Sequence, residues 1–191
     1  MSMHSNVRDF HIAFDLFVSD VPGLPDATIR SLRRSLLAEE VQELLDAEND
    51  NDIVEIADAL ADIIYIAAGT AVSYGFELLD KPYGAVSERP ALPHAEIRAD
   101  HQAHIQNLYT AYVSAEEAND LNLIRETLQY LMDSASACAA TYNIPLQAVF
   151  SEVHASNLAK LVDGKVLRRP DGKVQKPISW VPPNIKAILF P

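Results

Sequence analysis

The chain has 191 residues, with 15 Lys and Arg against 27 Asp and Glu, so its net charge is −12. This length fits one domain or at most two small ones, and 49% hydrophobic residues predict a globular fold. The acidic charge excludes a general nucleic-acid binder, and the single cysteine, Cys138, excludes a disulfide framework and a cysteine-based zinc site. Neither a signal peptide nor a bilayer-spanning apolar run is recognisable, so we expect a cytoplasmic protein that contacts no membrane.

The charge is divided unevenly along the chain. Residues 160–191 contain seven basic and two acidic residues, which leaves +5 for this basic tail and −17 for residues 1–159. Such a division is typical of a solvated body whose tail neutralises it. It is equally typical of an acidic cation site beside a basic arm that binds an anion, and a metal–polyphosphate substrate would use both parts.

Hydrophobic periodicity predicts six helices and no run of strands, and therefore an all-α bundle with antiparallel neighbours. The predicted helices cover about residues 6–18, 27–48, 53–74, 94–118, 121–142 and 145–161. Asp26 and Asp52 are suitable N-caps for the second and third helices, and Gly75 is a natural stop for the third. Pro145 fits the first turn of the last helix.

We expect a single domain over residues 1–191, built around two helical hairpins. Its parts are a first hairpin at 27–75, a Pro-rich linker at 80–93, a second hairpin at 94–143, and the last helix with the basic tail at 145–191. Tyr74 aligns with Tyr142 at the hairpin ends, which indicates a diverged duplication, although any two helical hairpins share this order of elements. In that alignment Asp62 falls opposite Tyr130, so the first hairpin would carry a site and the second would be scaffold.

Four carboxylates are predicted to converge inside the first hairpin. Antiparallel pairing about the turn at residues 50–51 sets Glu43 opposite Asp58 and Glu40 opposite Asp62. Glutamates alone would indicate a solvated helix face, but Asp62 lies in a helix that is apolar nearly all round and so needs a partner or a metal. All-oxygen ligation favours Mg²⁺ or Mn²⁺, which would bridge phosphate oxygens and activate a water.

The last helix and the tail carry polar residues suited to a nucleotide. Asn157 and Lys160 follow His154 on a polar strip; this strip either orients the helix end or reads a base and a phosphate. Trp180 is either a hydrophobic plug for the tail or a platform for base stacking. Cys138, in an Ala- and Ser-rich helix, is expected to be an inert core residue.

These motifs together resemble the MazG-like all-α nucleotide pyrophosphohydrolases, which include phosphoribosyl-ATP pyrophosphatases and dimeric dUTPases. The first hairpin matches the family pattern with Glu39-Glu40-Val-Gln-Glu43, then Glu55-Ile-Ala-Asp58 and Asp62-Ile-Ile-Tyr65. Ala59 stands where the family has a glutamate, so Glu55 remains an alternative ligand to Asp58 or Asp62. The segments 150–160 and 171–180 look like the tail of a subgroup with dUTP-hydrolysing members, and the resemblance covers about residues 6–79 and 146–188.

The resemblance implies a Mg²⁺-dependent enzyme that cleaves a nucleoside triphosphate to a monophosphate and pyrophosphate, with dUTP or a purine dNTP such as dGTP as substrate. It also implies a homodimer or a higher homo-oligomer. The residues then expected at the site are Glu39 for the attacking water, Glu40, Glu43, Asp58 and Asp62 for the metal, and Asn157, Lys160, Arg168, Arg169, Lys173, Lys176 and Trp180 for the substrate. The alternatives are a phosphoribosyl-ATP pyrophosphatase-like hydrolase, a non-catalytic helical scaffold and a ferritin-like di-iron protein, against which the absence of histidine from the acidic cluster argues.

Overall fold

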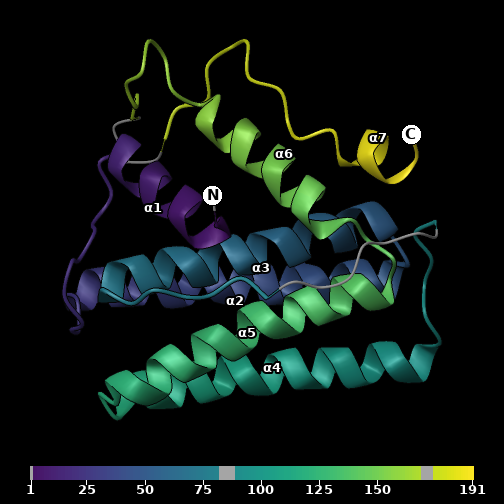
Figure 1. Ribbon diagram of the computed structural model, residues 1–191, viewed down its shortest axis with the longest axis horizontal. Coiled ribbons are helices and arrows are strands. Elements are labelled where there is room, and N and C mark those ends of the chain that lie inside the picture. The colour runs from purple at the N-terminus through teal and green to yellow at the C-terminus, as the bar shows by residue number, and fades with distance from the viewer. Residues whose placement is uncertain (1, 82–88, 169–173) are drawn as a thin grey trace.

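The computed structural model describes residues 2–81, 89–168 and 174–191, and within these ranges it contains helices and no strands (Figure 1). This confirms the predicted all-α fold. The helices are α1 (Met3–Ala13), α2 (Ala27–Asp50), α3 (Ile53–Tyr74), α4 (Ala95–Glu117), α5 (Leu121–Thr141), α6 (Leu146–Leu158) and α7 (Ile185–Leu189).

Helix α3 lies at the centre of the molecule. It packs against α1, α2, α5, α6 and α7, and most of its side chains are buried. In Figure 1, α1 and α6 lie on one side of the α2–α3 pair, and α5 and α4 lie on the other. This central place explains why the sequence of α3 is apolar on nearly every face.

Local capping fixes the ends of α3 where the sequence predicts them. The Asp52 side chain accepts hydrogen bonds from the backbone N–H groups of Val54 and Glu55 at the first turn. Gly75 ends the helix in the left-handed region with φ of 73°, and a Cβ there would lie 2.1 Å from the Val21 carbonyl oxygen. A glycine is therefore required both by the backbone conformation and by the close approach of the preceding loop.

The structure corrects the prediction at both ends of the chain. Helix α1 is shifted toward the N-terminus because Ser2 caps it and Asp15, at φ of 52°, follows its end, so Phe17 lies outside the helix and is 48% exposed. The basic tail contains a short helix, α7, that the periodicity did not reveal. It is capped by Asn184.

The two hairpins correspond residue by residue. A shift of 68 residues, from Ala27 to Ala95, carries α2 onto α4 and α3 onto α5 to within one residue at each end. The same shift relates the left-handed Asn51 and Asn119, with φ of 58° and 55°. We propose that the two hairpins arose by duplication of one ancestral hairpin, which would produce this correspondence.

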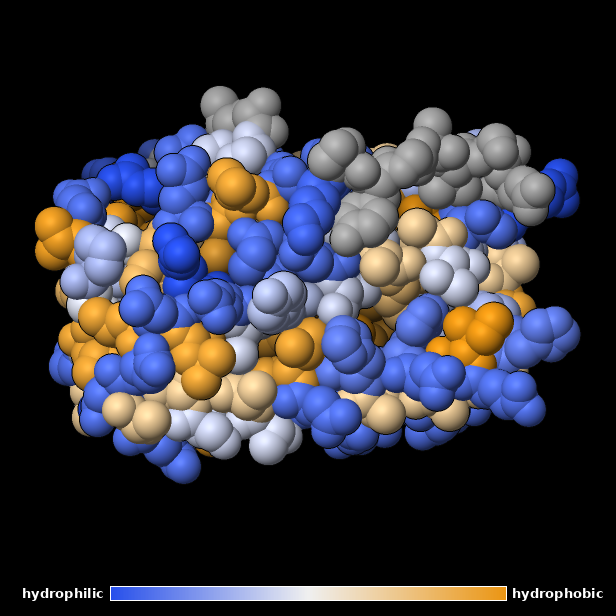
Figure 2. Space-filling view, turned by 60° about the horizontal axis from the view of Figure 1, so that its bottom comes forward, coloured by the Kyte–Doolittle hydropathy of each residue, from blue (hydrophilic) through white to orange (hydrophobic). Residues whose placement is uncertain are grey.

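The face over α4 and α5 is turned forward in Figure 2, where hydrophilic residues alternate with small hydrophobic patches. Ile97, Leu123 and Tyr130 are the large apolar side chains exposed on these two helices, at 40%, 41% and 54%. In the described parts of the chain, no helix combines the length and the apolar character needed to cross a membrane.

Candidate active site

The acidic residues of α2 and α3 come together across the hairpin as the sequence predicts. Burial is the main cause that raises the pKa of Glu40 to about 8, and the charges of Asp62, Glu43, Asp58 and Glu39 raise it further, in that order. The carboxylate that affects Glu40 most is thus Asp62, its predicted opposite.

The two aspartates of α3 share this environment. Burial, followed by the charges of Glu55 and Glu43, raises the pKa of Asp58 to about 6. Burial, followed by Asp58 and Glu43, raises the pKa of Asp62 to about 7. The cation of Lys160 acts in the opposite direction on Asp62, which indicates that the turn after α6 lies near the cluster.

Two oxygens of the cluster are buried without any hydrogen-bond partner. They are Oε2 of Glu40 and Oδ1 of Asp58. A buried carboxylate oxygen without a donor costs free energy unless a proton or a cation compensates it. The donor set consists of carboxylate oxygens alone, so these residues fit a hard divalent cation such as Mg²⁺.

No three of Glu40, Glu43, Asp58 and Asp62 bring carboxylate oxygens within 4.8 Å of one another. Among the described residues, three ligand atoms lie within 4.8 Å of one another only at Glu48, His101 and Cys138.

An acidic hollow of about 380 Å³ opens from the cluster toward the hairpin turn. Its lining consists of Glu43, Asp46, Ala47, Asp50, Asp52, Glu55, Asp58 and Ala59. Glu55 therefore lies at the rim, beside Asp58, while Glu39 is exposed on α2 next to Glu40. These places agree with the expectation that both residues flank the cluster.

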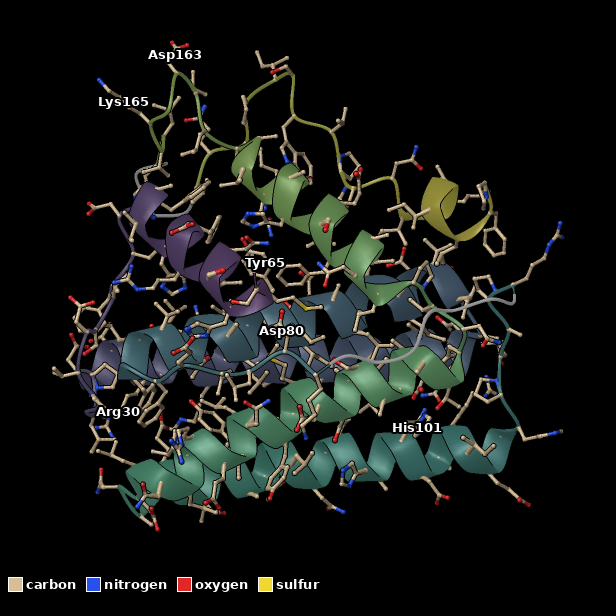
Figure 3. The ribbon with its side chains drawn as sticks, in the orientation of Figure 1. Arg30, Tyr65, Asp80, His101, Asp163 and Lys165 are labelled. Carbon is tan, nitrogen blue, oxygen red and sulfur yellow. The ribbon has the colours of Figure 1, made fainter. Side chains whose placement is uncertain are left out.

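On the other side of Asp62, aromatic and polar side chains fill the space between α1, α3 and α6. Figure 3 shows Tyr65 pointing from α3 into this space. Its hydroxyl oxygen lies 3.1 Å from Nδ1 of His154, and its ring lies 5.4 Å from that of Phe10 and 5.6 Å from that of Phe150. Nζ of Lys160 donates to Oδ1 of Asn157 at 2.6 Å.

Trp180 joins the basic tail to α6. Its Nε1 donates to the carbonyl oxygen of Ser156 at 2.9 Å. Nζ of Lys176 lies 3.9 Å from the ring centroid and that of Lys160 lies 5.5 Å from it, so two cations stack on one indole. The structure therefore brings Asn157, Lys160, Lys176 and Trp180 together, beside Asp62.

Arg168 lies elsewhere, at the end of α1. Its Nη2 donates to the carbonyl oxygen of Phe14 at 2.8 Å, and its backbone pairs with that of Val174. Lys173, Arg169 and the turn at Asp171 lie outside the described residues.

Sequence reasoning missed two buried pairs between the hairpins. Tyr142 donates to Glu48, and Tyr74 donates to Glu116, each through the hydroxyl group. The alignment of Tyr74 with Tyr142 had the necessary signal, because the same shift of 68 residues relates Glu48 to Glu116. The burial of Arg33 was missed as well, because a charged side chain is rarely found inside a helical bundle.

Comparison with known proteins gives a family for the first hairpin. Residues 7–90 match the phosphoribosyl-ATP pyrophosphohydrolase family. That family is part of the MazG-like superfamily, so this segment of the chain is similar to that superfamily. The match begins in α1, contains every acidic residue of the cluster and ends before α4, so it includes α2 and α3 but not the second hairpin.

The chain is also similar to a viral protein. It is 27% identical over 145 residues to the uncharacterized protein L479 of Acanthamoeba polyphaga mimivirus. This similarity covers 68% of the chain and 58% of that protein.

Proposed function

We propose that the protein hydrolyses a nucleoside triphosphate to a nucleoside monophosphate and pyrophosphate. The observation that carries this proposal is the acidic cluster, in which Glu40 of α2 and Asp58 of α3 each bury an oxygen without a hydrogen bond. Such a cluster is costly without a cation, and a cation beside lysines suits a polyphosphate. The family match over residues 7–90 supports the same class of reaction.

Glu40, Glu43, Asp58 and Asp62 would hold the cation, and Mg²⁺ or Mn²⁺ fits their oxygen ligands. When bound, the ion would offset the charge of these acids and of the phosphate oxygens. Glu55, at the rim of the acidic hollow, is the alternative ligand.

Glu39 would act on the attacking water. It is exposed on α2, and its charge contributes to the raised pKa of Glu40. From there its carboxylate can orient a water molecule toward the α-phosphorus and accept its proton. The oxygen of that water then bonds to the α-phosphorus, the bond to the oxygen that bridges to the β-phosphorus breaks, and pyrophosphate leaves.

Helix α6 and the tail that follows it would bind the rest of the nucleotide. Lys160 lies close enough to Asp62 to affect its pKa, so it can contact phosphate oxygens near the cluster. Lys176 stacks on Trp180 in the same region, and we assign it to the polyphosphate together with Lys173. Arg168, which the sequence also suggested for this role, donates to Phe14 at the end of α1 and is left out of the set. Asn157 and Trp180 are then left for the base and the sugar.

A pyrophosphate-release assay with Mg²⁺ and a panel of canonical and modified NTPs and dNTPs tests the proposal, with dUTP and dGTP as the first candidates. The substitution Asp62→Asn should lower the rate by at least about 100-fold, because the cation loses a charged ligand. Glu126→Gln is the matched control, since Glu126 takes the place of Asp58 in the second hairpin and should leave the rate unchanged. Absence of pyrophosphate release by the wild-type protein from every nucleotide of the panel would refute the proposal.

The family match also favours a second candidate substrate. Its description names phosphoribosyl-ATP, so this compound belongs in the same panel. A preference for it over every NTP and dNTP would move the proposal to that substrate. If the protein were a non-catalytic scaffold, Asp62→Asn would leave its function unchanged and would increase its stability.

We further propose a cytoplasmic homodimer or higher homo-oligomer. Exposed apolar side chains such as Leu32 of α2 and Leu123 of α5, at 54% and 41%, support a surface for a second copy. Sedimentation equilibrium of the full chain measures the state of association.

A further inference from the structure

Two buried glutamates occupy equivalent places in the two hairpins. Glu48 lies in the last turn of α2 and Glu116 in the last turn of α4, and each is 1% exposed. Each accepts a hydrogen bond from a tyrosine at the end of the other hairpin, Tyr142 for Glu48 and Tyr74 for Glu116. The contact between the hairpins at Glu48 and the contact at Glu116, which we call the two junctions, are therefore built alike. They differ in the residues around each glutamate.

A guanidinium compensates only one of the two glutamates. Nε of Arg34 lies 2.8 Å from Oε2 of Glu116. At the other junction the equivalent of Arg34 is Gln102, and Oε2 of Glu48 is buried without a hydrogen-bond partner. Arg98 is close, but its Nη1 donates to the backbone carbonyl of Glu48 at 3.2 Å rather than to the carboxylate. The carboxylate of Glu48 thus lacks the direct cation that Glu116 has.

A second pair of residues also carries a cation at the Glu116 junction and none at the Glu48 junction. At the Glu116 junction, Nε of Arg33 donates to Oγ1 of Thr70 at 3.1 Å. The equivalents are His101 and Cys138, whose Nδ1 and Sγ lie 3.2 Å apart. A cation and a hydroxyl in one junction are replaced by two metal-binding side chains in the other.

Glu48, His101 and Cys138 bring one ligand atom each within 4.8 Å of the other two. They come from three helices, α2, α4 and α5, and Figure 3 shows His101 on α4 at the side that faces α5. A tetrahedral zinc ion holds its nitrogen, oxygen and sulfur ligands about 3.3–3.8 Å apart, so small side-chain shifts would complete the set.

We propose that Glu48, His101 and Cys138 form a zinc site that joins the two hairpins. A thiolate, an imidazole and a carboxylate suit Zn²⁺, whereas Mg²⁺ prefers oxygen ligands alone. The ion would supply the positive charge that Arg34 supplies to Glu116, and it would displace the proton of the Cys138 thiol to solvent. Water or the Tyr142 hydroxyl completes the fourth position. This proposal departs from the expectation that a single cysteine excludes a cysteine-based zinc site, since one cysteine is enough when histidine and glutamate lie beside it.

Titration of the chelator-treated full chain with Co²⁺ tests this site, because a cobalt–thiolate bond gives a charge-transfer band in the near ultraviolet. We expect the band to saturate at one equivalent of Co²⁺ and to disappear when Zn²⁺ is added. Cys138→Thr, which copies the residue at position 70, should fold as the wild type does and lose the band. Zn²⁺ should raise the melting temperature of the wild type but not that of this variant.

Asp62→Asn is the control that separates this site from the acidic cluster, and it should keep the cobalt–thiolate band in full. His101→Gln should weaken binding of Co²⁺ by about 10-fold or more, since it removes one of three protein ligands. A wild-type protein that is folded by circular dichroism and gives no band overturns the proposal. A band of equal strength in Cys138→Thr overturns it as well.

Discussion

At the scale of single residues, the contact of α3 with Arg33 and His11 depends on Gly69. A Cβ at this position would lie 2.5 Å from Nη2 of Arg33 and 2.7 Å from Nε2 of His11. Alanine usually stabilises a helix relative to glycine by about 1 kcal/mol. Here it would displace a buried guanidinium that donates to the carbonyl oxygen of Ile66 at 2.8 Å.

We therefore expect Gly69→Ala to lower the free energy of unfolding by about 1–3 kcal/mol, as overpacking of a core does. Urea denaturation measures it. Gly23→Ala is the control, because nothing lies within 4 Å of the added methyl group, and it should change stability by less than about 0.5 kcal/mol. An unchanged midpoint for Gly69→Ala would contradict the close contact.

His11 makes stability depend on pH. Its ring is 3% exposed, and Nδ1 lies 3.1 Å from the Phe17 carbonyl oxygen, so the neutral ring carries its proton there. Burial and the charge of Arg33 lower the pKa of His11 to about 4. The unfolded ring titrates near 6.5, so below that pH the unfolded chain binds more protons and stability falls as pH falls.

Between pH 7 and pH 5 this linkage amounts to about 2 kcal/mol for a shift of this size. His11→Asn keeps a donor for the Phe17 carbonyl and should lack this loss. Urea unfolding of both proteins at the two pH values measures it. Carboxyl groups with raised pKa, Glu40 and Asp62 among them, act in the opposite sense but equally in both proteins. Parallel pH profiles of the two proteins would exclude the assignment.

At the scale of helices, the sequence predicted most where caps and periodicity agree. The bounds of α3 match the prediction at both ends because Asp52 and Gly75 act locally. The start of α1 could not be predicted as well, since Ser2, Asn6 and other polar residues compete as caps in a short stretch. Helix α7 has five residues, a pattern too short to detect from the sequence. The Asn184 cap and the packing of Ile185 and Leu189 against the bundle stabilise it.

Trp180 is the aromatic anchor of the tail on α6, in addition to the packing of α7. Its indole donates to α6 and carries Lys176 and Lys160 on its ring. Trp180→Ala should release this segment and raise KM for the nucleotide about 5- to 10-fold with little change in kcat, as a loss of about 1 kcal/mol in binding implies. Steady-state kinetics of pyrophosphate release give both constants. Trp180→Phe keeps an aromatic ring for the lysines and should recover most of the affinity; a loss confined to kcat would argue against this role.

At the scale of the whole molecule, the two Tyr–Glu pairs connect the hairpins, and they should differ in strength. Without its tyrosine, Glu116 still pairs with the guanidinium of Arg34, whereas Glu48 in the metal-free protein would keep a hydrogen bond from the neutral amide of Gln102 and no direct cation. We expect Tyr142→Phe to cost about 2–3 kcal/mol and Tyr74→Phe about 1 kcal/mol. Urea denaturation in the presence of a chelator compares them. Equal losses would contradict the asymmetry between the two junctions.

These junctions also show what the sequence could not give. The sequence could relate Glu40 to Asp62 because they lie in one hairpin, at equal distances from its turn, and Asp62 is the charge that raises the pKa of Glu40 most. Glu48 and Tyr142 are 94 residues apart, and no local rule joins them. The internal alignment shows that the Glu48–Tyr142 pair corresponds to the Glu116–Tyr74 pair. It does not by itself predict that either pair is in contact. Contacts between repeats therefore needed the structure, while contacts within a repeat did not.

The proposed duplication would leave one acidic cluster, that of the first hairpin, so we expect the chain to bind one nucleotide. In the second hairpin the places of Asp58 and Asp62 are taken by Glu126 and Tyr130, and the glutamates of α2 correspond to Leu108 and Ala111. A single glutamate on an exposed helix face cannot hold a divalent cation with its polyphosphate. With Mg²⁺ and a non-hydrolysable α,β-imido analogue of the best substrate, isothermal titration calorimetry should therefore find one nucleotide per chain. Asp58→Asn should weaken binding by at least about 10-fold because a charged ligand is lost, and Glu126→Gln should leave both affinity and stoichiometry unchanged. Two equivalents per chain, or a loss of binding in Glu126→Gln, would mean that the second hairpin has kept a site of its own.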